Sequence, residues 1–411
     1  MEEEKPTEGP LTKPCVKCRA QEATLESRTH AVCRNCFTKF IAGKCIKQIG
    51  LLGKETRHPQ STAGGPPNTT RRYLLGLSLG VSSTVLLHLL NENIEFQLAK
   101  GRNAPFELRV VHIDNAILHK PQTIFSPTQQ ALSRLVRRYP RFQFQCIPLS
   151  SVLTDLDLTS LPLPPGTSQS IRTLLTTLPT AASREDILRL LTRQALISLA
   201  RTQHCQALLL GHSTTALAEL TLAETAKGRG YALPWLINDG PAPSHPDDEE
   251  EEEEVVVVTN GAGNDKPSLL IYHPLRDALR KELVTYARLI DPPLTELAVT
   301  GADGHQNGAP AVVSHRDLTI EEVMDRYFAE VEENYPSVVA NVARTTGKLV
   351  RAGEEARGGG EGGGERCGLC GMPLDEIGDE RWRGELGLGT GIKTADGQGR
   401  LCYGCERSTA G

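Results

Sequence analysis

From Arg72 onward, short apolar runs alternate with longer stretches in which apolar positions recur every three to four residues. The runs have the length of buried strands, and the stretches have the period of helices with one buried face. Strands are predicted at 73–77, 107–114, 142–149 and 207–211, and helices at 83–98, 127–139, 184–204 and from Thr214. This βαβαβαβα order predicts an α/β fold with a parallel sheet. Further along, a short strand is predicted at 271–274 and helices at 277–289, 320–333 and 338–350.

Changes in composition divide the chain into segments. Glycine and proline mark a linker at 55–70 and a tether at 358–364, and an acidic stretch interrupts the pattern at 241–267. We therefore expect an α/β domain at 71–240, continued with C-terminal helices at 268–357. It is flanked by cysteine-containing segments at 1–54 and 365–411.

The net charge of −5 is a local property of the acidic stretch. Eight consecutive acids occupy 247–254, and without them the rest of the chain carries +3. A self-repelling run of this kind favours a solvated, flexible insertion. An electrostatic gate that competes with phosphate for a basic groove is the alternative. A mildly basic remainder is compatible with a nucleic-acid partner.

Eight of the 11 cysteines form four C-x-x-C pairs. Cys15 and Cys18 precede Cys33 and Cys36 by a gap of 14 residues, and Cys367 and Cys370 precede Cys402 and Cys405 by a gap of 31. Each C-x-x-C turn presents two thiolates on one side, so two such turns suit one tetrahedral zinc ion. Two structural Zn²⁺ sites are therefore predicted, with pairing across the termini left open. Isolated Cys45, Cys146 and Cys205 are expected to be core thiols.

The sequence favours a cytoplasmic protein. The N-terminal Met1-Glu2-Glu3-Glu4 lacks the basic and apolar regions of a signal peptide. The longest apolar stretch, 73–90, contains too many polar residues for a lipid-facing helix, so no membrane contact is expected. Paired cysteines in a reducing compartment more often hold metal than form disulfides.

Candidate binding residues follow three of the predicted strands. The first strand leads into Ser78, Leu79, Gly80, Val81, Ser82 and Ser83 and then a helix. A Gly-containing turn before a helix N-terminus can hold a phosphate, although a plain strand-to-helix turn is an equally good interpretation. Asp114 ends the second strand and His212 follows the fourth, so the three stretches should meet at one edge of the sheet. His212 could contact a nucleotide, but a hydrogen-bonded structural role is favoured.

In the order of these features, the chain resembles the PP-loop ATP-pyrophosphatase superfamily, with its adenine-nucleotide-hydrolase-like fold. Within it, the chain is most similar to the cytoplasmic tRNA 2-thiolation protein 2 family. The resemblance rests on the cysteine pairs, the loop at 77–83, the Leu-Leu-Leu-Gly-His stretch, Gly228-Arg229-Gly230, the segment at 272–276 and the Glu-Asn-Tyr-Pro-Ser segment at 333–337.

The loop departs from the superfamily pattern S-G-G-x-D-S. Leu79 replaces a glycine and Ser82 replaces the acid, while residues 213–216 lack the acids of the G-H-N-x-D-D motif. A side chain at position 79 obstructs close backbone approach. The sulfur-transfer relatives also have a C-x-x-C after the third strand that is absent here. These departures argue against catalytic residues in this chain and against ATP–Mg²⁺ binding.

The resemblance implies a non-catalytic subunit of a heterodimeric tRNA thiolase, which supplies tRNA contacts and scaffold. It implies 2-thiolation of the wobble uridine (U34, as mcm5U34) in Lys, Gln and Glu tRNAs. The catalytic partner would use ATP, and a thiocarboxylated ubiquitin-related modifier would carry the sulfur. One alternative is that this chain is itself an ATP-dependent, tRNA-adenylating sulfurtransferase. Another is a zinc-finger scaffold without an RNA role.

Two groups of charged residues are expected to have mainly structural or solvent-exposed roles. Glu185 and Asp186 are expected to be first-turn acids favoured by a helix dipole. Dispersed cations suit phosphate contacts, although solvated helix faces account for most of them. They are Arg71, Arg72, Arg134, Arg137, Arg138, Arg141, Arg276, Arg280, Lys281, Arg344, Lys348 and Arg351.

Overall fold

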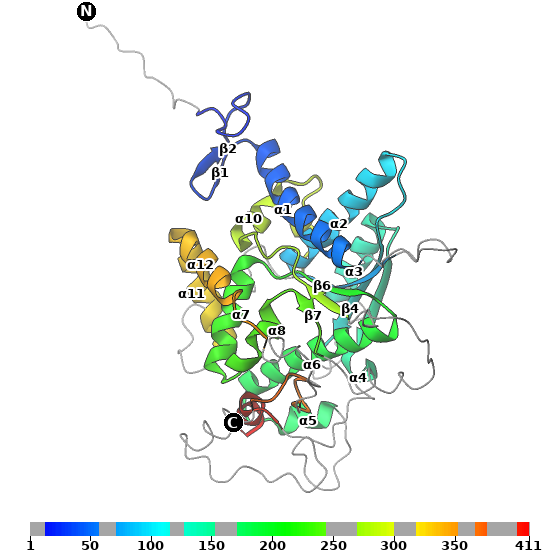
Figure 1. The fold of residues 1–411 in the computed structure, drawn as a ribbon, viewed down its shortest axis with the longest axis vertical. Coiled ribbons are helices and arrows are strands. Elements are labelled where there is room, and N and C mark those ends of the chain that lie inside the picture. Colours follow the sequence, from blue (N-terminus) through cyan, green and yellow to red (C-terminus); the bar gives the residue numbers. More distant parts are fainter. Residues whose placement is uncertain are drawn as a thin grey trace, which may run out of the picture.

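The computed structural model describes residues 13–56, 71–115, 127–152, 171–243, 269–299, 318–351, 366–375 and 401–410. Its centre is a six-stranded sheet in the order β5-β4-β3-β6-β8-β7 (Figure 1). All neighbours pair in parallel except β7, which runs antiparallel to β8. The strands are β3 (Arg72–Gly76), β4 (Glu107–Asp114), β5 (Gln143–Pro148), β6 (Ala207–Leu210), β7 (Gly240–Pro241) and β8 (Leu270–Tyr272). The predicted α/β fold with a mostly parallel sheet is confirmed.

Helices cover both faces of the sheet, which is therefore buried on both sides. One face packs against α1 (Arg34–Glu55), α2 (Val81–Ala99), α3 (Pro127–Arg138) and α10 (Arg280–Leu289). The other packs against α4 (Leu149–Val152), α5 (Ile171–Thr177), α6 (Ala181–Thr202) and α8 (Leu233–Ile237). Residues of β3 alternate between the two cores, since Leu74 faces the second core and Tyr73 and Leu75 face the first.

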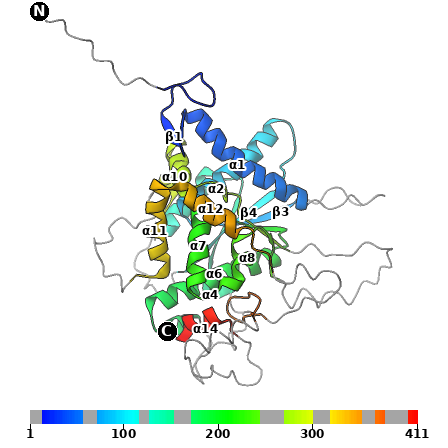
Figure 2. The ribbon, with the colours of Figure 1, turned by 60° about the vertical axis from the view of Figure 1, so that its left-hand side comes forward.

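Three further helices form a side layer (Figure 2). α11 (Ile320–Asn334) and α12 (Pro336–Thr346) pack on α7 (Thr214–Ala226) around Ala218, Phe328 and Val339. The predicted break between the two helices is confirmed, and the second begins at Pro336 because proline fits the first turn of a helix. The helix predicted at 277–289 begins only at Arg280, because the Glu282 carboxylate accepts a hydrogen bond from the Leu279 N–H and caps it.

The N-terminal segment is a hairpin, β1 (Leu25–Ser27) and β2 (His30–Val32), followed by the long helix α1. The sequence predicted the cysteine turns but not this helix. Ile41, Cys45 and Leu52 of α1 are buried in the same core as Tyr73 and Leu75, so the segment packs directly on the sheet domain. Burial raises the pKa of the Cys45 thiol to about 12, in keeping with the predicted core thiol.

The two ends of the described chain lie at opposite ends of the molecule. The hairpin lies beside the first turns of α1, and the C-terminal helix α14 (Tyr403–Ala410) lies below α6 in both views (Figures 1 and 2). The remaining short elements are η3 (Gly230–Ala232) and η4 (Leu294–Leu297). Most of the acidic stretch at 241–267 and the whole tether at 358–364 lie outside the described residues. No helix in the described ranges is long and apolar enough to cross a membrane.

Of the two thiols predicted to lie in the sheet domain's core, one is buried and one is not. Cys205 is buried, whereas Cys146 is exposed, so the prediction for Cys146 was wrong. Cys146 is exposed because β5 is an edge strand of the sheet, and Cys146 lies on a part of this strand that neither core covers.

Candidate functional site

The strand order reverses between β3 and β6, where the chain leaves β3 toward β4 on one side and later returns to form β6 on the other. In open α/β sheets, ligands bind at such a point, outside the carboxyl ends of the strands. The loop Ser78–Ser83 follows β3, and Gly211 and His212 follow β6. The structure therefore brings these predicted residues to the same edge.

The loop at 78–83 is held by its own hydroxyls. Ser78 Oγ accepts from the Gly80 N–H at 3.3 Å and lies 3.0 Å from Ser83 Oγ. Ser83 and Thr84 hydroxyls each donate to the Gly80 carbonyl at 3.0 Å. Gly80 precedes α2 without a side-chain cap, so the N–H groups of the first helical turn point to this edge.

Leu79 is the residue that sets this loop apart from an open phosphate cradle. Its φ is +64°, in the left-handed region that favours glycine, yet its side chain is only 2% exposed and belongs to the core under α2. The Leu79 carbonyl accepts from the Val299 N–H at 2.9 Å, which ties the loop to the segment after η4. The backbone thus keeps a glycine-like turn, while the leucine side chain replaces open space with packing.

The loop at 78–83 also packs closely against the end of β6. A Cβ at Gly211 would lie 2.8 Å from Ser83 Cα and 3.0 Å from Ser83 N, so only glycine allows β6 to end against the start of α2. His112 Nδ1 hydrogen-bonds the Leu77 carbonyl at 2.8 Å, which fixes the end of β3 to β4. Asp114 lies at the carboxyl end of β4 and is half-buried.

His212 is buried beside His273, and its hydrogen-bonded structural role stays a prediction. The Nδ1 atom of His212 is buried and has no hydrogen-bond partner within the described ranges, and the centroid of the His212 ring is 5.2 Å from that of the His273 ring. Burial and then the neighbouring His273 lower the pKa of His212 well below its usual value, so its imidazole is neutral. Asp239 accepts from His273 Nδ1 at 3.0 Å and pairs with Arg276 at 2.7 Å.

The loop at 78–83 does not suit an ATP–Mg²⁺ group. Mg²⁺ requires oxygen ligands with near-octahedral geometry and is usually bound through carboxylates. The loop from Ser78 to Ser83 contains no carboxylate, and Leu79 fills the space beside it. No reaction step is therefore assigned to these residues.

The structure brings together the two predicted sets of four cysteines. In each set the four Sγ atoms lie within 4.8 Å of one another, with Cys18 and Cys33 Sγ at 3.8 Å and Cys370 and Cys402 Sγ at 3.9 Å. Four sulfurs at about 2.3 Å from one tetrahedral ion would be about 3.8 Å apart. The separations fit a single ion better than a four-iron cluster, whose thiolates bind different iron atoms. Each set is a candidate metal centre formed within its own terminus.

The two centres differ in burial. At the N-terminal centre Cys15 and Cys33 are buried, Cys36 is half-buried and Cys18 is exposed. At the C-terminal centre Cys367, Cys370 and Cys405 are buried and belong to the core formed with α6 and α8. Gln194 of α6 donates to the Cys370 carbonyl, which joins this centre to the sheet domain.

A buried ionic cluster, which the sequence did not predict, lies beside α14. Asp186 of α6 accepts from Arg229 at 2.6 and 2.7 Å and from Lys227 at 2.7 Å, and Arg229 also donates to Glu224 at 2.7 Å. Ser408 Oγ of α14 donates to Asp186 at 2.7 Å. The carboxylates of Asp186, Glu224 and Glu321 are close enough for a metal, but Arg189, Lys227 and Arg229 already neutralise them.

Asp186 is therefore part of a docking site for the C-terminus. The prediction that Glu185 and Asp186 are first-turn acids was wrong, because α6 begins at Ala181 and its first turn contains no acid. The only signal in the sequence was Gly228-Arg229-Gly230. A Cβ at Gly228 would lie 2.4 Å from the Tyr403 ring, and one at Gly404 would lie 2.3 Å from Arg229 Cγ. The glycines let the turn after α7 and the start of α14 meet.

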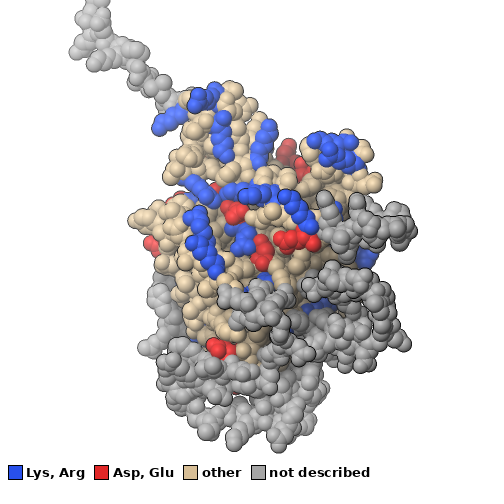
Figure 3. All heavy atoms as spheres, in the orientation of Figure 1, with Lys and Arg blue, Asp and Glu red and all other residues tan. Residues whose placement is uncertain are grey.

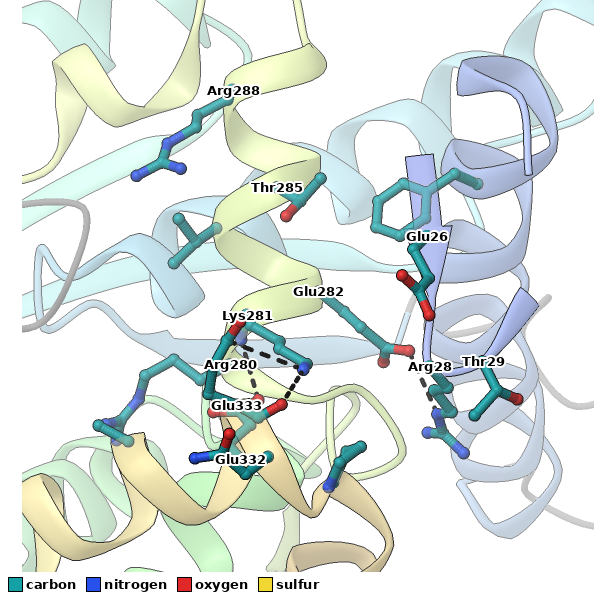
Figure 4. Close-up of a pocket in the computed structure, with 15 residues that line it drawn as sticks. Glu26, Arg28, Thr29, Arg280, Lys281, Glu282, Thr285, Arg288, Glu332 and Glu333 are labelled. Carbon is teal, nitrogen blue, oxygen red and sulfur yellow. Dashed lines mark hydrogen bonds and ion pairs between the residues drawn. The ribbon is translucent and has the colours of Figure 1, made fainter. Parts of the chain in front are cut away.

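A groove of about 640 Å³ separates the hairpin from α10 and the end of α11 (Figure 4). Arg28 of the hairpin points toward Glu282 of α10, with Nε and Oε1 3.2 Å apart, and Lys44 of α1 reaches the same carboxylate at 3.1 Å. Four cations and four carboxylates line the groove, so its charge is balanced. It is a polar joint that holds the N-terminal segment on α10.

The fold and the cysteines define a class: an α/β protein with a mostly parallel sheet and a four-cysteine centre near each end of the chain. A solved U34-tRNA thiolase, NcsA from Methanococcus maripaludis with its [4Fe-4S] cluster, has this fold, with a TM-score of 0.51 and 16% identity over 88% of this chain and 96% of that one. A family model described as cytoplasmic tRNA 2-thiolation protein 2 matches residues 319–388, which include α11, α12 and the Cys367–Cys370 turn.

Curated relatives extend the match to nearly the full length. The cytoplasmic tRNA 2-thiolation protein 2 of Phaeosphaeria nodorum is 34% identical over 96% of this chain and 94% of its own length. That of Pyrenophora tritici-repentis is 32% identical with the same coverage. The chain belongs to the cytoplasmic tRNA 2-thiolation protein 2 family, and the family name agrees with the expected location and pathway.

Proposed function

We propose that this chain is the non-catalytic subunit of a heterodimeric tRNA thiolase and supplies tRNA contacts and scaffold. The observation that carries the proposal is Leu79, which keeps the turn of a phosphate loop and fills it with a buried side chain. The partner would have the intact loop, adenylate the wobble uridine of Lys, Gln and Glu tRNAs, and accept sulfur from a thiocarboxylated ubiquitin-related modifier.

We further propose that each four-cysteine centre holds one Zn²⁺. The sulfur separations and the all-thiolate donor set support a single tetrahedral ion. Residues Cys15, Cys18, Cys33 and Cys36 would hold one ion and Cys367, Cys370, Cys402 and Cys405 the other. Each ion would supply structure and no step of the reaction. In this proposal 71–240 and 268–357 form one domain, and the terminal segments are attached to it through their centres.

The direct test is tRNA-dependent AMP release by the purified chain, alone and with a thiolase that retains S-G-G-x-D-S. We expect no turnover from the chain alone and turnover from the pair. AMP release by the isolated chain at a rate near that of the pair would contradict the proposal and support the enzyme alternative. Failure of the two chains to co-purify would contradict the heterodimer.

A further inference from the structure

Helix α1 has a buried face and an outer face of different chemistry. The buried face carries Ile41, Cys45 and Leu52 into the core. The outer face carries three exposed lysines, Lys39, Lys47 and Lys54, which we call the lysine stripe. Between them lie Gly43 and Gly50, so that positions 39, 43, 47, 50 and 54 follow one side of the helix over successive turns.

The lysine stripe belongs to a strongly basic part of the chain. Residues 13–56 contain nine Lys and Arg and three Glu, which leaves +6. Figure 3 shows Lys and Arg side chains gathered over the N-terminal segment, α1 and α10. Arg28 and Lys44 are engaged with Glu282, whereas the three lysines of the stripe make no ion pair or hydrogen bond within the described ranges. The stripe is therefore available to an anionic partner.

Most of the dispersed cations that the sequence suggested for RNA contacts have other roles in the structure. Arg276 pairs with Asp239, Arg280 pairs with Glu219 and Asp325, and Arg351 is buried. Several others bond to neighbouring carbonyls, such as Arg134 and Arg138 beside η4. The structure therefore favours the N-terminal segment, and not the dispersed arginines, as the surface whose positive charge is available to RNA.

The spacing of the stripe suits an elongated anion. Lys39 and Lys47 are separated by about 12 Å along the helix axis, and Lys47 and Lys54 by about 10.5 Å, at the usual rise per residue. Glycine destabilises a helix interior relative to alanine. Added Cβ atoms at Gly43 and Gly50 would meet nothing within 4 Å, so no contact in the described structure requires glycine there. A partner backbone that passes close to the helix would account for both glycines.

We propose that the lysine stripe binds the phosphate backbone of RNA, which under the proposed function is tRNA. A protein partner is the less suitable occupant, because lysine is depleted at protein interfaces and their energetic centres favour Trp, Tyr and Arg. The polar joint of Arg28 and Lys44 with Glu282 holds α1 on α10 and gives the stripe a fixed direction relative to the sheet edge. This inference rests on the proposed function and adds the surface that binds the RNA.

The test measures binding of a tRNA transcript to the full chain in complex with its thiolase, between about 50 and 200 mM salt. Replacing Lys39, Lys47 and Lys54 by Gln should weaken binding about tenfold at the low end and reduce the slope of log K against log salt by about two. A charge-matched control replaces exposed Lys100, Arg102 and Arg172 by Gln and should leave the slope within about half a unit of the wild type.

A second variant separates binding from folding. Gly43→Gln with Gly50→Gln introduces better helix formers without changing the charge, so the melting temperature should rise while RNA affinity falls severalfold. Equal effects of the stripe and control triples would overturn the inference. So would an unchanged affinity in the stripe variant while the complex stays intact, which leaves the heterodimer proposal standing. Loss of the thiolase instead of the RNA would show that the stripe binds protein.

Discussion

Leu79 combines a left-handed backbone with a buried side chain, and the two features have opposite effects on stability. Removing the side chain should cost about 2–5 kcal/mol because it leaves a cavity. The left-handed backbone costs a non-glycine residue about 1–2 kcal/mol. We therefore expect Leu79→Gly to be more stable than Leu79→Ala by about 1 kcal/mol, the reverse of the order in a helix.

Urea unfolding of the two variants measures this difference directly. Leu77→Ala and Leu77→Gly, at a neighbouring buried position without positive φ, form the matched pair, and there the alanine variant should be the more stable. The same order at both positions would mean that the turn at Leu79 is not left-handed in solution. Calorimetry should detect no ATP–Mg²⁺ binding to Leu79→Gly, since the loop still lacks a carboxylate.

Asp186 is the residue on which the buried ionic cluster depends. Burial alone would raise the pKa of this carboxyl, but Arg229, Lys227 and Arg189 hold it well below its usual range. Burial is likewise outweighed at Glu224, where Arg189, Arg229 and Lys227 lower the pKa to about 2. Because the folded pKa values are lowered, their contribution to stability is full above the unfolded values and is lost as pH falls from about 4.5 toward 2.

Asp186→Asn should therefore destabilise the protein by about 3 kcal/mol or more at pH 7, because it leaves buried cations without a partner. The variant should also lose less stability than the wild type between pH 4.5 and pH 3. Denaturant unfolding at several pH values measures both effects. Glu95→Gln, at an exposed acid paired with Arg141 at 3.6 Å, should stay within about 0.5 kcal/mol of the wild type. A similar cost for both variants would refute the buried cluster.

At the scale of elements, the turn after α7 and the helix α14 depend on each other. Gly228 has a φ of +81°, and an added Cβ would overlap the Tyr403 ring at 2.4 Å. Gly228→Ala should separate α14 from the ionic cluster and speed amide exchange at 401–410. Gly230→Ala is the matched control, because nothing lies within 4 Å of its Cβ position. Hydrogen exchange that is unchanged by Gly228→Ala would show that α14 docks elsewhere.

The strands and most helices followed from the sequence because their apolar runs are continuous or have a clear period, as in 207–210. Helix α1 did not, because Gly43, Gly50 and Gly53 weaken the helical signal while its packing on Tyr73 and Leu75 is a tertiary effect. The cysteine centres were predictable because each pair is local. The ionic cluster joins Asp186 to Arg229 and Ser408, and such distant pairing has no local pattern.

For the whole molecule, the two centres should respond differently to metal removal, because the N-terminal centre has an exposed cysteine, Cys18, whereas all four cysteines of the C-terminal centre are buried or half-buried. Two zinc ions per chain are expected. Cys18→Ser and Cys370→Ser should each reduce the content to one. A chelator should remove the N-terminal ion first, with little change in sheet-domain stability. Loss of the C-terminal ion should lower the melting temperature by several degrees, because it loosens the packing of Leu369, Met372 and α14 on α6.

Metal analysis with a colorimetric chelator, followed in time beside circular dichroism, distinguishes the two events. The fast phase should disappear in Cys18→Ser and the slow phase in Cys370→Ser. A protein without bound metal would refute both centres, and equal release rates would refute the difference in burial. If loss of the ion released in the fast phase also weakens tRNA binding, the N-terminal ion stabilises the hairpin that holds α1 in place. The C-terminal ion would then stabilise the sheet domain on which α1 and its lysine stripe pack, since its cysteines share the core with α6 and β6.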